Sequence, residues 1–377
     1  MNRVCAKGKC TGCKACIDIC PKEAVSFEDN LICSETKINN EKCIGCELCR
    51  RVCQANNPPS FSMPVVWYQG WANDQKIREN ASSGGVATAL SVAFINNGGV
   101  VCSCLFKDGD FQYQVINRIN ELEKFAGSKY VKSNPIGVYK SVKNYLRQGV
   151  SVLFIGLPCH VAAVRNYVGK ALEIKLYTVD LICHGTPSIK VLDHFLKQYH
   201  FDLKSIQNLN FRQKTHFQIR DGYKGIVING GTDRYSLAFL NSLIYTENCY
   251  ECKYARIERT SDITVGDSWG SELSSDEKKK GISLILCQTQ KGMELVNNSN
   301  LCLESVDLKK AISANHQLQE PSSKPKYYND ILKRLQHGEK FNRIVFHYLP
   351  WKCIKQDIKQ LLLRVKHVGG GEIIYSL

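Results

Sequence analysis

Apolar runs of strand length alternate with segments of helical spacing over much of the chain after residue 66. The runs 150–156 and 176–185 are short, continuous and apolar, as buried strands are. The segments 135–149 and 187–201 place apolar residues three and four apart, as amphipathic helices do. Strands and helices in alternation predict a mixed, partly parallel sheet covered by helices.

The two ends of the chain depart from this alternation. Cysteine-rich runs fill residues 1–56, and a Pro- and Ser-rich linker at 57–65 separates them from the rest. The region 301–377 is basic and has amphipathic spacing. We expect an α+β protein with a small domain at 1–56, a mixed α/β domain at 66–300 and a helical C-terminal region at 301–377.

The basic C-terminal region has two interpretations. Helices packed on the main domain with a solvated lysine face explain its pattern. Docking to a membrane surface or to a partner protein is the alternative.

Nineteen cysteines are the strongest compositional feature. The first residues contain no apolar run of a secretory signal, and no stretch reaches the roughly 18 apolar residues of a membrane span. We therefore expect a cytoplasmic protein without a transmembrane segment. In that compartment cysteines indicate metal binding or catalysis rather than disulfides.

Eight cysteines form two runs of identical spacing, C-x2-C-x2-C-x3-C, which is typical of bacterial ferredoxins. The fourth cysteine of such a run binds the cluster of the other run. The spacing predicts two 4Fe–4S clusters, one on Cys10, Cys13, Cys16 and Cys53 and the other on Cys43, Cys46, Cys49 and Cys20. A pair of zinc sites is the alternative, although zinc sites usually separate their CxxC pairs.

The residues around these runs agree with a duplicated unit. Gly12 and Gly45 occupy equivalent places, where the backbone passes close to inorganic sulfide. Residues 24–35 read as two short strands around an Asp-Asn turn. Cys5 and Cys33 fall outside the pattern and are interpreted as spare thiols.

The formal charge of +15 raises nucleic acid as a partner. The basic residues are spread out, however, and cysteine thiolates and clusters would lower the charge of the loaded protein. An anionic cofactor or an acidic electron carrier suits a basic surface equally well. We expect no nucleic-acid partner.

Chemically suggestive residues also follow the predicted strands of the main domain. Cys159 lies in the first turn of a predicted helix, where the helix dipole favours a thiolate. Cys183 and His184 end the next strand, and Cys249 and Cys252 form a CxxC pair. Sites of α/β proteins collect at such strand ends, although a buried cysteine alone is often a small hydrophobe.

Two glycine-containing turns add candidate phosphate contacts. Residues 82–85, SSGG, present backbone N–H groups at a helix start, which is a common way to hold a phosphate. A helix cap with a flexible turn explains the same motif equally well. Residues 126–130, AGSKY, place a lysine beside a second turn.

Taken in order, these segments resemble the coenzyme F420 hydrogenase/dehydrogenase beta-subunit family. The resemblance covers roughly residues 65–295, and the family often carries a two-cluster ferredoxin module ahead of it. The matching stretches are SSGGVATAL, AGSKYV, VLFIGLPCHVAAVR, DLICHGTPS, FRQK, CYECKYA, SDITVGDSWG and GISLIL.

The resemblance implies a flavin-binding main domain in which FAD lies next to a further 4Fe–4S cluster. It places that third cluster on Cys159, Cys183, Cys249 and Cys252. It places FAD over two loops, with backbone N–H groups holding phosphate and Lys129 balancing charge; the loop residues are Ser82, Ser83, Gly84, Gly85, Gly127, Ser128 and Lys129. The cysteines outside the family motifs are expected to be structural, namely Cys102, Cys104, Cys287, Cys302 and Cys353.

The chain departs from the family pattern at three positions. Leu157 and His160 replace the more usual Thr and Gln, and Ser268 stands where an aromatic residue is common. These changes flank the expected cofactor pocket, so they put the identity of the hydride partner in doubt. Three residues match family positions and are expected to fix loops, namely Asp180, Arg212 and Asp267.

The sequence thus predicts an iron–sulfur flavoprotein oxidoreductase. It would pass electrons between a hydride carrier or organic substrate, reduced coenzyme F420 among them, and one-electron carriers such as ferredoxin or another redox protein. The alternatives are a reductase of an organic substrate that uses ferredoxin without deazaflavin, and a non-catalytic electron-wiring subunit of a larger complex. No catalytic residue is assigned, and no ligand set of a hydrogenase metal site is found.

Overall fold

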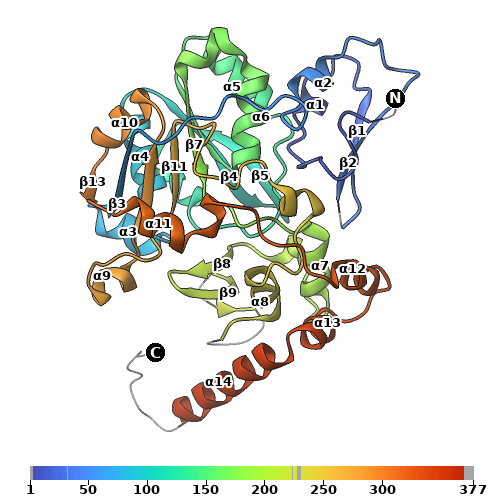
Figure 1. Cartoon of the computed structure of the whole chain (residues 1–377), viewed down its shortest axis with the longest axis vertical. Helices are drawn as coiled ribbons and strands as arrows, with labels where there is room; N and C mark the ends of the chain where they lie inside the picture. The colour runs from blue at the N-terminus through green and yellow to red at the C-terminus, as the bar shows by residue number, and fades with distance from the viewer. Residues whose placement is uncertain (1–2, 32, 223, 227–230, 369–377) are drawn as a thin grey trace.

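The computed structural model describes residues 3–31, 33–222, 224–226 and 231–368. An eight-stranded mixed sheet forms its centre, in the order β13-β3-β12-β11-β7-β6-β4-β5 (Figure 1). The strands of this sheet are β3 (Val66–Ala72), β4 (Val100–Lys107), β5 (Asp110–Ile116), β6 (Val152–Gly156), β7 (Leu176–Leu181), β11 (Ile263–Asp267), β12 (Ser283–Cys287) and β13 (Leu301–Glu304).

The four central strands, β11, β7, β6 and β4, run parallel, whereas the outer strands pair antiparallel. Parallel neighbours end at the same edge of a sheet, so the residues that follow β6, β7 and β11 are brought together. This edge is where α/β proteins place their sites.

Helices cover both faces of the sheet, because its central strands are apolar on both sides. In β6, Val152 and Phe154 join the core under α5 and α6, whereas Leu153 and Ile155 join the core under α4. The helices of this layer are α3 (Gln75–Asn80), α4 (Val86–Asn96), α5 (Val138–Arg147), α6 (Pro158–Val168), α9 (Ser275–Lys280), α10 (Gln290–Asn297) and α11 (Leu308–Ala314).

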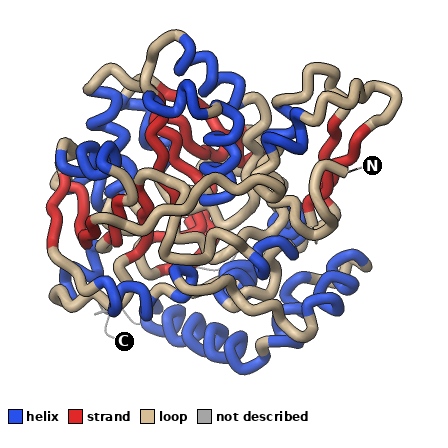
Figure 2. Tube along the Cα trace, turned by 45° about the horizontal axis from the view of Figure 1, so that its top comes forward, coloured by secondary structure: helices blue, strands red, loops and turns tan. Residues whose placement is uncertain are grey.

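The N-terminal domain contains a two-stranded hairpin and two short helices. Figure 2 shows the hairpin standing apart from the strands of the central sheet. Its elements are α1 (Ala15–Asp18), β1 (Val25–Asp29), β2 (Ser34–Ile38) and α2 (Leu48–Val52).

The backbone repeats in the two cysteine runs. Gly12 and Gly45 have φ of 74° and 70°, and Lys14 and Glu47, the residues before the two helices, both have φ of 58°. Left-handed backbone is uncommon outside glycine, so its recurrence at equivalent positions supports the duplicated unit that the spacing predicted.

The N-terminal domain docks on α5 and α6. Both carboxylate oxygens of Asp18 accept from the backbone N–H of Gly137, at 2.9 Å, at the start of α5. Tyr139 Oη donates to the carbonyl of Cys13 at 2.8 Å. Tyr167 Oη donates to the carbonyl of Asp18 at 3.3 Å.

A second lobe lies below the sheet in Figure 1 and has its own apolar core, which includes Phe195, Phe211, Tyr235 and Phe341. A three-stranded antiparallel sheet and five helices build it. They are α7 (Ile189–Lys197), β8 (Leu209–Gln213), β9 (His216–Asp221), β10 (Lys224–Gly225), α8 (Arg234–Leu240), α12 (Tyr328–Gln336), α13 (Phe341–Tyr348) and α14 (Pro350–Val368).

Five 3-10 turns complete the part of the chain that the structure describes. They are η1 (Ile119–Phe125), η2 (Lys170–Lys175), η3 (Leu203–Ser205), η4 (Glu247–Glu251) and η5 (His316–Leu318). Within the described ranges, no helix combines the length and the apolar character that crossing a bilayer requires.

The mixed α/β architecture with a large sheet is as the sequence predicted. One element differs. Residues 301–304, at the start of the region predicted as helical, form β13 and pair with β3 at the edge of the sheet. The strand was not predicted because four residues are too few to show the period of a strand. The helical region is predicted to start at residue 301 because the basic composition of the tail begins near there. The domain bounds themselves stay predictions.

Candidate functional site

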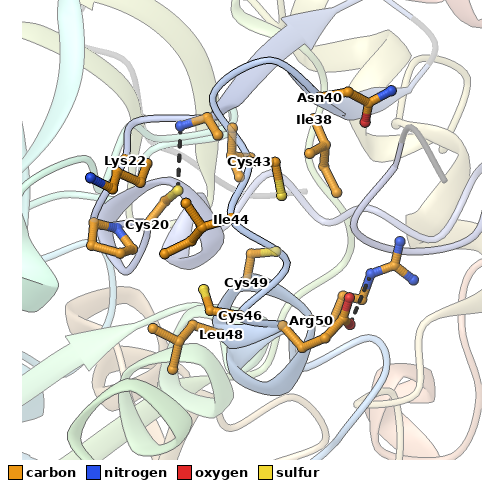
Figure 3. A pocket seen from close by; sticks show the side chains of 14 residues that line it. Cys20, Lys22, Ile38, Asn40, Cys43, Ile44, Cys46, Leu48, Cys49 and Arg50 are labelled. Carbon is orange, nitrogen blue, oxygen red and sulfur yellow. Dashed lines mark hydrogen bonds and ion pairs between the residues drawn. The ribbon is translucent and has the colours of Figure 1, made fainter.

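One cavity in the N-terminal domain is lined by four cysteines. Cys43, Cys46 and Cys49 of the second run and Cys20 of the first surround about 190 Å³ of space (Figure 3). The backbone N–H of Ala24 donates to Cys20 Sγ at 3.3 Å. The structure therefore brings together the four residues that the spacing assigned to one cluster.

The other four cysteines of the two runs are also neighbours. Burial and then the nearby Cys53 raise the pKa of Cys13 to about 12. Burial raises the pKa of Cys16, and Cys13, Cys10 and Cys53 add to the effect. Besides burial, Cys10 and Cys53 raise the pKa of both Cys13 and Cys16, so the four side chains lie close together. If all four were ionised, the repulsion between the thiolates would have to be offset by a cationic group among them.

Cys5 belongs to this neighbourhood, although the sequence pattern left it out as a spare thiol. Its thiol hydrogen-bonds to Cys10 and Cys53, and both bonds raise the pKa of Cys5. The bond from Cys5 is also the main cause that lowers the pKa of Cys53, to about 6. No spacing rule covers a cysteine five residues upstream of the run. Cys33 lies elsewhere, buried in the hairpin near Glu35.

A third set of cysteines meets at the carboxyl edge of the sheet. Cys159, Cys183, Cys249 and Cys252 line one cavity of about 60 Å³. They come from the start of α6, the end of β7 and the turn η4, which are far apart in sequence. The resemblance grouped these four residues, and the fold places them around one space.

The electrostatics of this cavity differ from the expectation for Cys159. The dipole of α6 was expected to favour a thiolate, but burial raises the pKa of the Cys159 thiol. Burial likewise raises the pKa of Cys183 to about 12 and that of Cys252 to about 11. Desolvation outweighs the dipole here, so these thiols would ionise only with a metal bound.

Arg259 supplies unpaired donors at the same cavity. Its side chain lines the space and is 1% exposed, and its Nε and Nη2 have no hydrogen-bond partner among the described residues. Its ion pair with buried Asp180 is long, at 3.8 Å. Buried donors are seldom left unpaired. They fit an anionic group in the cavity, as a cluster with four thiolate ligands would be.

Among the described residues, no three His, Cys, Asp or Glu side chains have the spacing of a single-ion site. The fit of a metal group therefore rests on the cysteine-lined cavities and on Arg259.

A cleft of about 440 Å³ opens at the same edge of the sheet. Two loops line it, and Ser128 N–H donates to Ser82 Oγ at 2.8 Å across them. Six of the seven residues expected to hold FAD lie on its wall, namely Ser82, Ser83, Gly85, Gly127, Ser128 and Lys129. The exception is Gly84, whose N–H donates to Ser283 Oγ at 3.0 Å and is not free for a phosphate.

Lys129 is the basic group of this loop pair. Its Nζ donates to the carbonyls of Phe125 and Ala126, at 2.7 and 2.9 Å. Burial lowers the pKa of Lys129 to about 8. A phosphate in the cleft would stabilise the charged lysine, as its expected role requires.

Aromatic and ionic side chains also line the cleft. Tyr130 stacks on Phe239 with ring centroids 4.3 Å apart. Arg212 and Asp267 make a bidentate pair at 2.6 and 2.7 Å. The pair is mostly buried and Arg212 also reaches Tyr130 Oη at 3.3 Å, so its visible role is to fix this wall.

The three departures from the family pattern lie at different depths. Leu157 lines both the cleft and the neighbouring cysteine cavity. His160 is buried and its Nδ1 lies 2.9 Å from Tyr113 Oη, which lines the cleft. Ser268 Oγ donates to Gln69 Oε1 at 3.3 Å. Only Leu157 therefore touches the cleft directly.

The cleft and the cysteine cavity share a wall made of Leu157 and residues 183–186. His184 in this wall is fixed by Gln317, whose Nε2 lies 2.7 Å from His184 Nδ1. Burial lowers the pKa of His184 to about 4, so the imidazole is neutral near pH 7. Gln317 belongs to the C-terminal region and carries no motif, so sequence reasoning missed it.

The cysteine cavity also reaches the N-terminal domain. Thr11 and Gln54 line it, next to Cys10 and Cys53 of the first cysteine set. Gln54 Nε2 donates to Thr11 Oγ1 at 2.8 Å, and Tyr254 Oη donates to Gln54 Oε1 at 2.6 Å. Gln54 stands where proline is usual in a ferredoxin run, and it joins the two domains here.

Comparison with known families identifies three segments. A 4Fe–4S dicluster domain matches residues 9–57. The N-terminal part of the coenzyme F420 hydrogenase/dehydrogenase beta subunit matches residues 67–138, and its C-terminal part matches residues 149–310.

Two individual proteins are also similar. The coenzyme F420-dependent sulfite reductase of Methanocaldococcus jannaschii is 22% identical over 338 residues, which are 83% of this chain and 48% of that protein. The chain thus spans about half the length of this relative. A chain of the F420-reducing NiFe hydrogenase complex of Methanosarcina barkeri, studied as a xenon derivative, aligns with a TM-score of 0.45 and 18% identity, covering 74% of this chain and 94% of that one.

The two beta-subunit matches together span most of the main domain and follow the dicluster match in order. They agree with the motifs around the cleft and the cysteine cavity. The chain belongs to the coenzyme F420 hydrogenase/dehydrogenase beta-subunit family and carries an N-terminal 4Fe–4S dicluster domain.

Proposed function

We propose that the chain is an iron–sulfur flavoprotein oxidoreductase that exchanges electrons between a hydride carrier at the cleft and a redox protein at the N-terminal domain. The observation that carries the proposal is the continuity of the sites. The cleft shares a wall with one cysteine cavity, and that cavity is lined by residues adjoining the first cysteine set of the N-terminal domain.

The cluster ligands follow from the cavities. Cys159, Cys183, Cys249 and Cys252 would hold a cluster beside the cleft. The next cluster would be held by Cys10, Cys13, Cys16 and Cys53, and the outermost by Cys20, Cys43, Cys46 and Cys49. Cys43 is exposed and Ile44 is 60% exposed at that outer cavity, which supports this side as the contact for a redox partner.

The residues of the cleft fit FAD in distinct ways. N–H groups at the start of α4 and in the Gly127 turn would hold the phosphates, with Lys129 balancing their charge. Tyr130 and Phe239 provide an apolar wall for the ring system. A flavin bound here would supply the conversion between a hydride and single electrons. Neutral His184 would orient the ring at the wall shared with the cysteine cavity.

Coenzyme F420 is the proposed hydride carrier. The support comes from the names of the matched family and of the relative, both of which specify this coenzyme. The formal charge of +15 also favours an anionic carrier.

The test is an anaerobic titration of the purified protein with reduced F420 and, separately, with NADH. The proposal predicts that reduced F420 bleaches the flavin absorbance and then the cluster absorbance, whereas NADH does not. In Cys183→Ser the flavin should still be reduced, but the N-terminal clusters should stay oxidised. If NADH reduced the protein and reduced F420 did not, NADH rather than coenzyme F420 would be the hydride carrier. A purified protein without flavin would favour the electron-wiring subunit.

A further inference from the structure

Five apolar residues of helix α14 are exposed to solvent. Counted from the start of the helix, these residues are three, four, three and one positions apart, so they form one stripe along the helix. We call this set the apolar stripe: Trp351, Ile354, Ile358, Leu361 and Leu362, which are 81, 37, 54, 62 and 60% exposed. In Figure 1, α14 runs along the lower edge of the molecule.

The opposite side of α14 docks on the second lobe through mainly polar contacts. Asp357 accepts two hydrogen bonds from Arg234, both at 2.7 Å. Gln356 Oε1 accepts from the backbone N–H of Thr232 at 3.4 Å, and Gln360 is 7% exposed. A surface helix usually does the reverse and buries its apolar side, so docking on the lobe does not account for the stripe.

Lysines flank the apolar stripe on one side. Lys352, Lys355 and Lys359 are all exposed. With a turn of 100° per residue, these three lysines lie on the sector of the helix surface next to the apolar stripe. Asp357, the one acid between residues 350 and 363, is paired with Arg234 on the docked side. Helices that lie in a bilayer interface typically have an apolar side that includes tryptophan and basic residues along its margin, as α14 does.

We propose that α14 binds the surface of a membrane that contains anionic lipid. The helix would lie in the plane of the interface, with the apolar stripe at the boundary of headgroups and acyl chains and the lysines among the headgroups. The formal charge of +15 adds long-range attraction to such a surface. This surface is separate from the cleft and the cysteine cavities, so the proposal does not depend on the proposed function.

The experiment is a flotation assay of the full holoprotein with vesicles of phosphatidylcholine, alone or mixed with phosphatidylglycerol. Ile358→Glu/Leu362→Glu interrupts the apolar stripe. Lys352→Gln/Lys355→Gln/Lys359→Gln removes the basic margin. The matched control, Lys278→Gln/Lys279→Gln/Lys280→Gln, removes three exposed lysines from α9.

The proposal predicts binding to the mixed vesicles that weakens with salt. Both α14 variants should bind about tenfold or more weakly, whereas the α9 control should bind like the unchanged protein. All variants should keep the same unfolding temperature and iron content. Equal binding by all four proteins, or no binding to the mixed vesicles, would overturn it. So would an oligomer that Ile358→Glu/Leu362→Glu dissociates without any vesicle binding, because a second copy would then cover the stripe.

Discussion

Arg259 lines the cysteine cavity and pairs with the buried carboxylate of Asp180, and its buried Nε and Nη2 have no hydrogen-bond partner among the described residues. A charge held there acts through a low local dielectric. Because reduction adds negative charge to a cluster, a nearby cation stabilises the reduced state.

Arg259→Gln should therefore lower the midpoint potential of the proposed third cluster by tens of millivolts, a tenfold change being about 59 mV for one electron. An anaerobic redox titration followed by electron paramagnetic resonance measures the shift. Because Asp180 loses its partner in Arg259→Gln, Asp180→Asn/Arg259→Gln should fold better, and its potential should lie between those of Arg259→Gln and the unchanged protein because a nearby negative charge is removed as well. Arg256→Gln, which removes an exposed arginine paired with Glu258, should leave the potential unchanged. An unaltered potential in the first two variants would show that Arg259 does not act on a cluster.

Lys129 would give the proposed flavin binding a predictable pH dependence. Its pKa of about 8 lies below the ordinary lysine value because the side chain is buried. A bound diphosphate favours the charged lysine, so binding is coupled to proton uptake above that pH. The affinity of the flavin-free protein for FAD should stay constant below about pH 8 and fall as the pH rises through it.

The loss should reach about fivefold, the equivalent of about 1 kcal/mol for a partly screened charge pair. Fluorescence titration with FAD at each pH measures it. Lys129→Met should bind more weakly at pH 7 and show no such decline. Burial also lowers the pKa of Lys214 to about 8. Lys214 does not line the cleft itself, but it bonds the carbonyls of Arg78 and of Ser83, and Ser83 does line it. If the affinity for FAD still fell with rising pH in Lys129→Met but not in Lys214→Met, Lys214 rather than Lys129 would be the titrating group.

At the scale of elements, helix α5 depends on a cap from another domain. Its N-cap is Gly137, with φ of 83° and no capping side chain of its own. Asp18 of the N-terminal domain supplies the carboxylate instead, at 2.9 Å. The negative charge also complements the positive end of the helix dipole.

Asp18→Ala should destabilise the holoprotein by about 1 to 2 kcal/mol, as loss of a helix cap does. Thermal unfolding should occur roughly 2 to 8 °C lower. Glu41→Ala, which removes an exposed acid of the same domain, is the control and should melt like the unchanged protein. Equal melting of both variants would mean that the cross-domain cap contributes nothing.

The elements were predictable where the apolar pattern is helical over several turns, as in α5 and α7, or continuous over a whole strand, as in β6 and β7. β13 was not, because four residues show no period. The grouping of Cys159, Cys183 and the CxxC pair required the resemblance, since their spacings alone define no cluster. Cys5, Gln317 and Arg259 are placed by tertiary packing, and no local pattern marks them.

At the scale of the whole molecule, the fold places three cavities and one buried set of cysteines next to one another. The apolar cleft comes first, followed by the cavity at the carboxyl edge of the sheet, the buried cysteine set around Cys13 and the outer cavity around Cys43. Gln54 bridges the second and third of these through Thr11 and Tyr254. The hydrogen bonds of the ferredoxin-like domain to α5 and α6 hold this domain beside the cavity at the carboxyl edge of the sheet.

The most direct test of this account is the cofactor content of protein purified without oxygen, measured as iron, acid-labile sulfide and extracted flavin per chain. Three 4Fe–4S clusters and one flavin require about twelve iron atoms and one FAD. Cys252→Ser should hold about eight iron atoms, whereas Cys302→Ser, which removes a cysteine outside the three sets, should still hold about twelve. About eight iron atoms and no flavin in the unchanged protein would contradict the account.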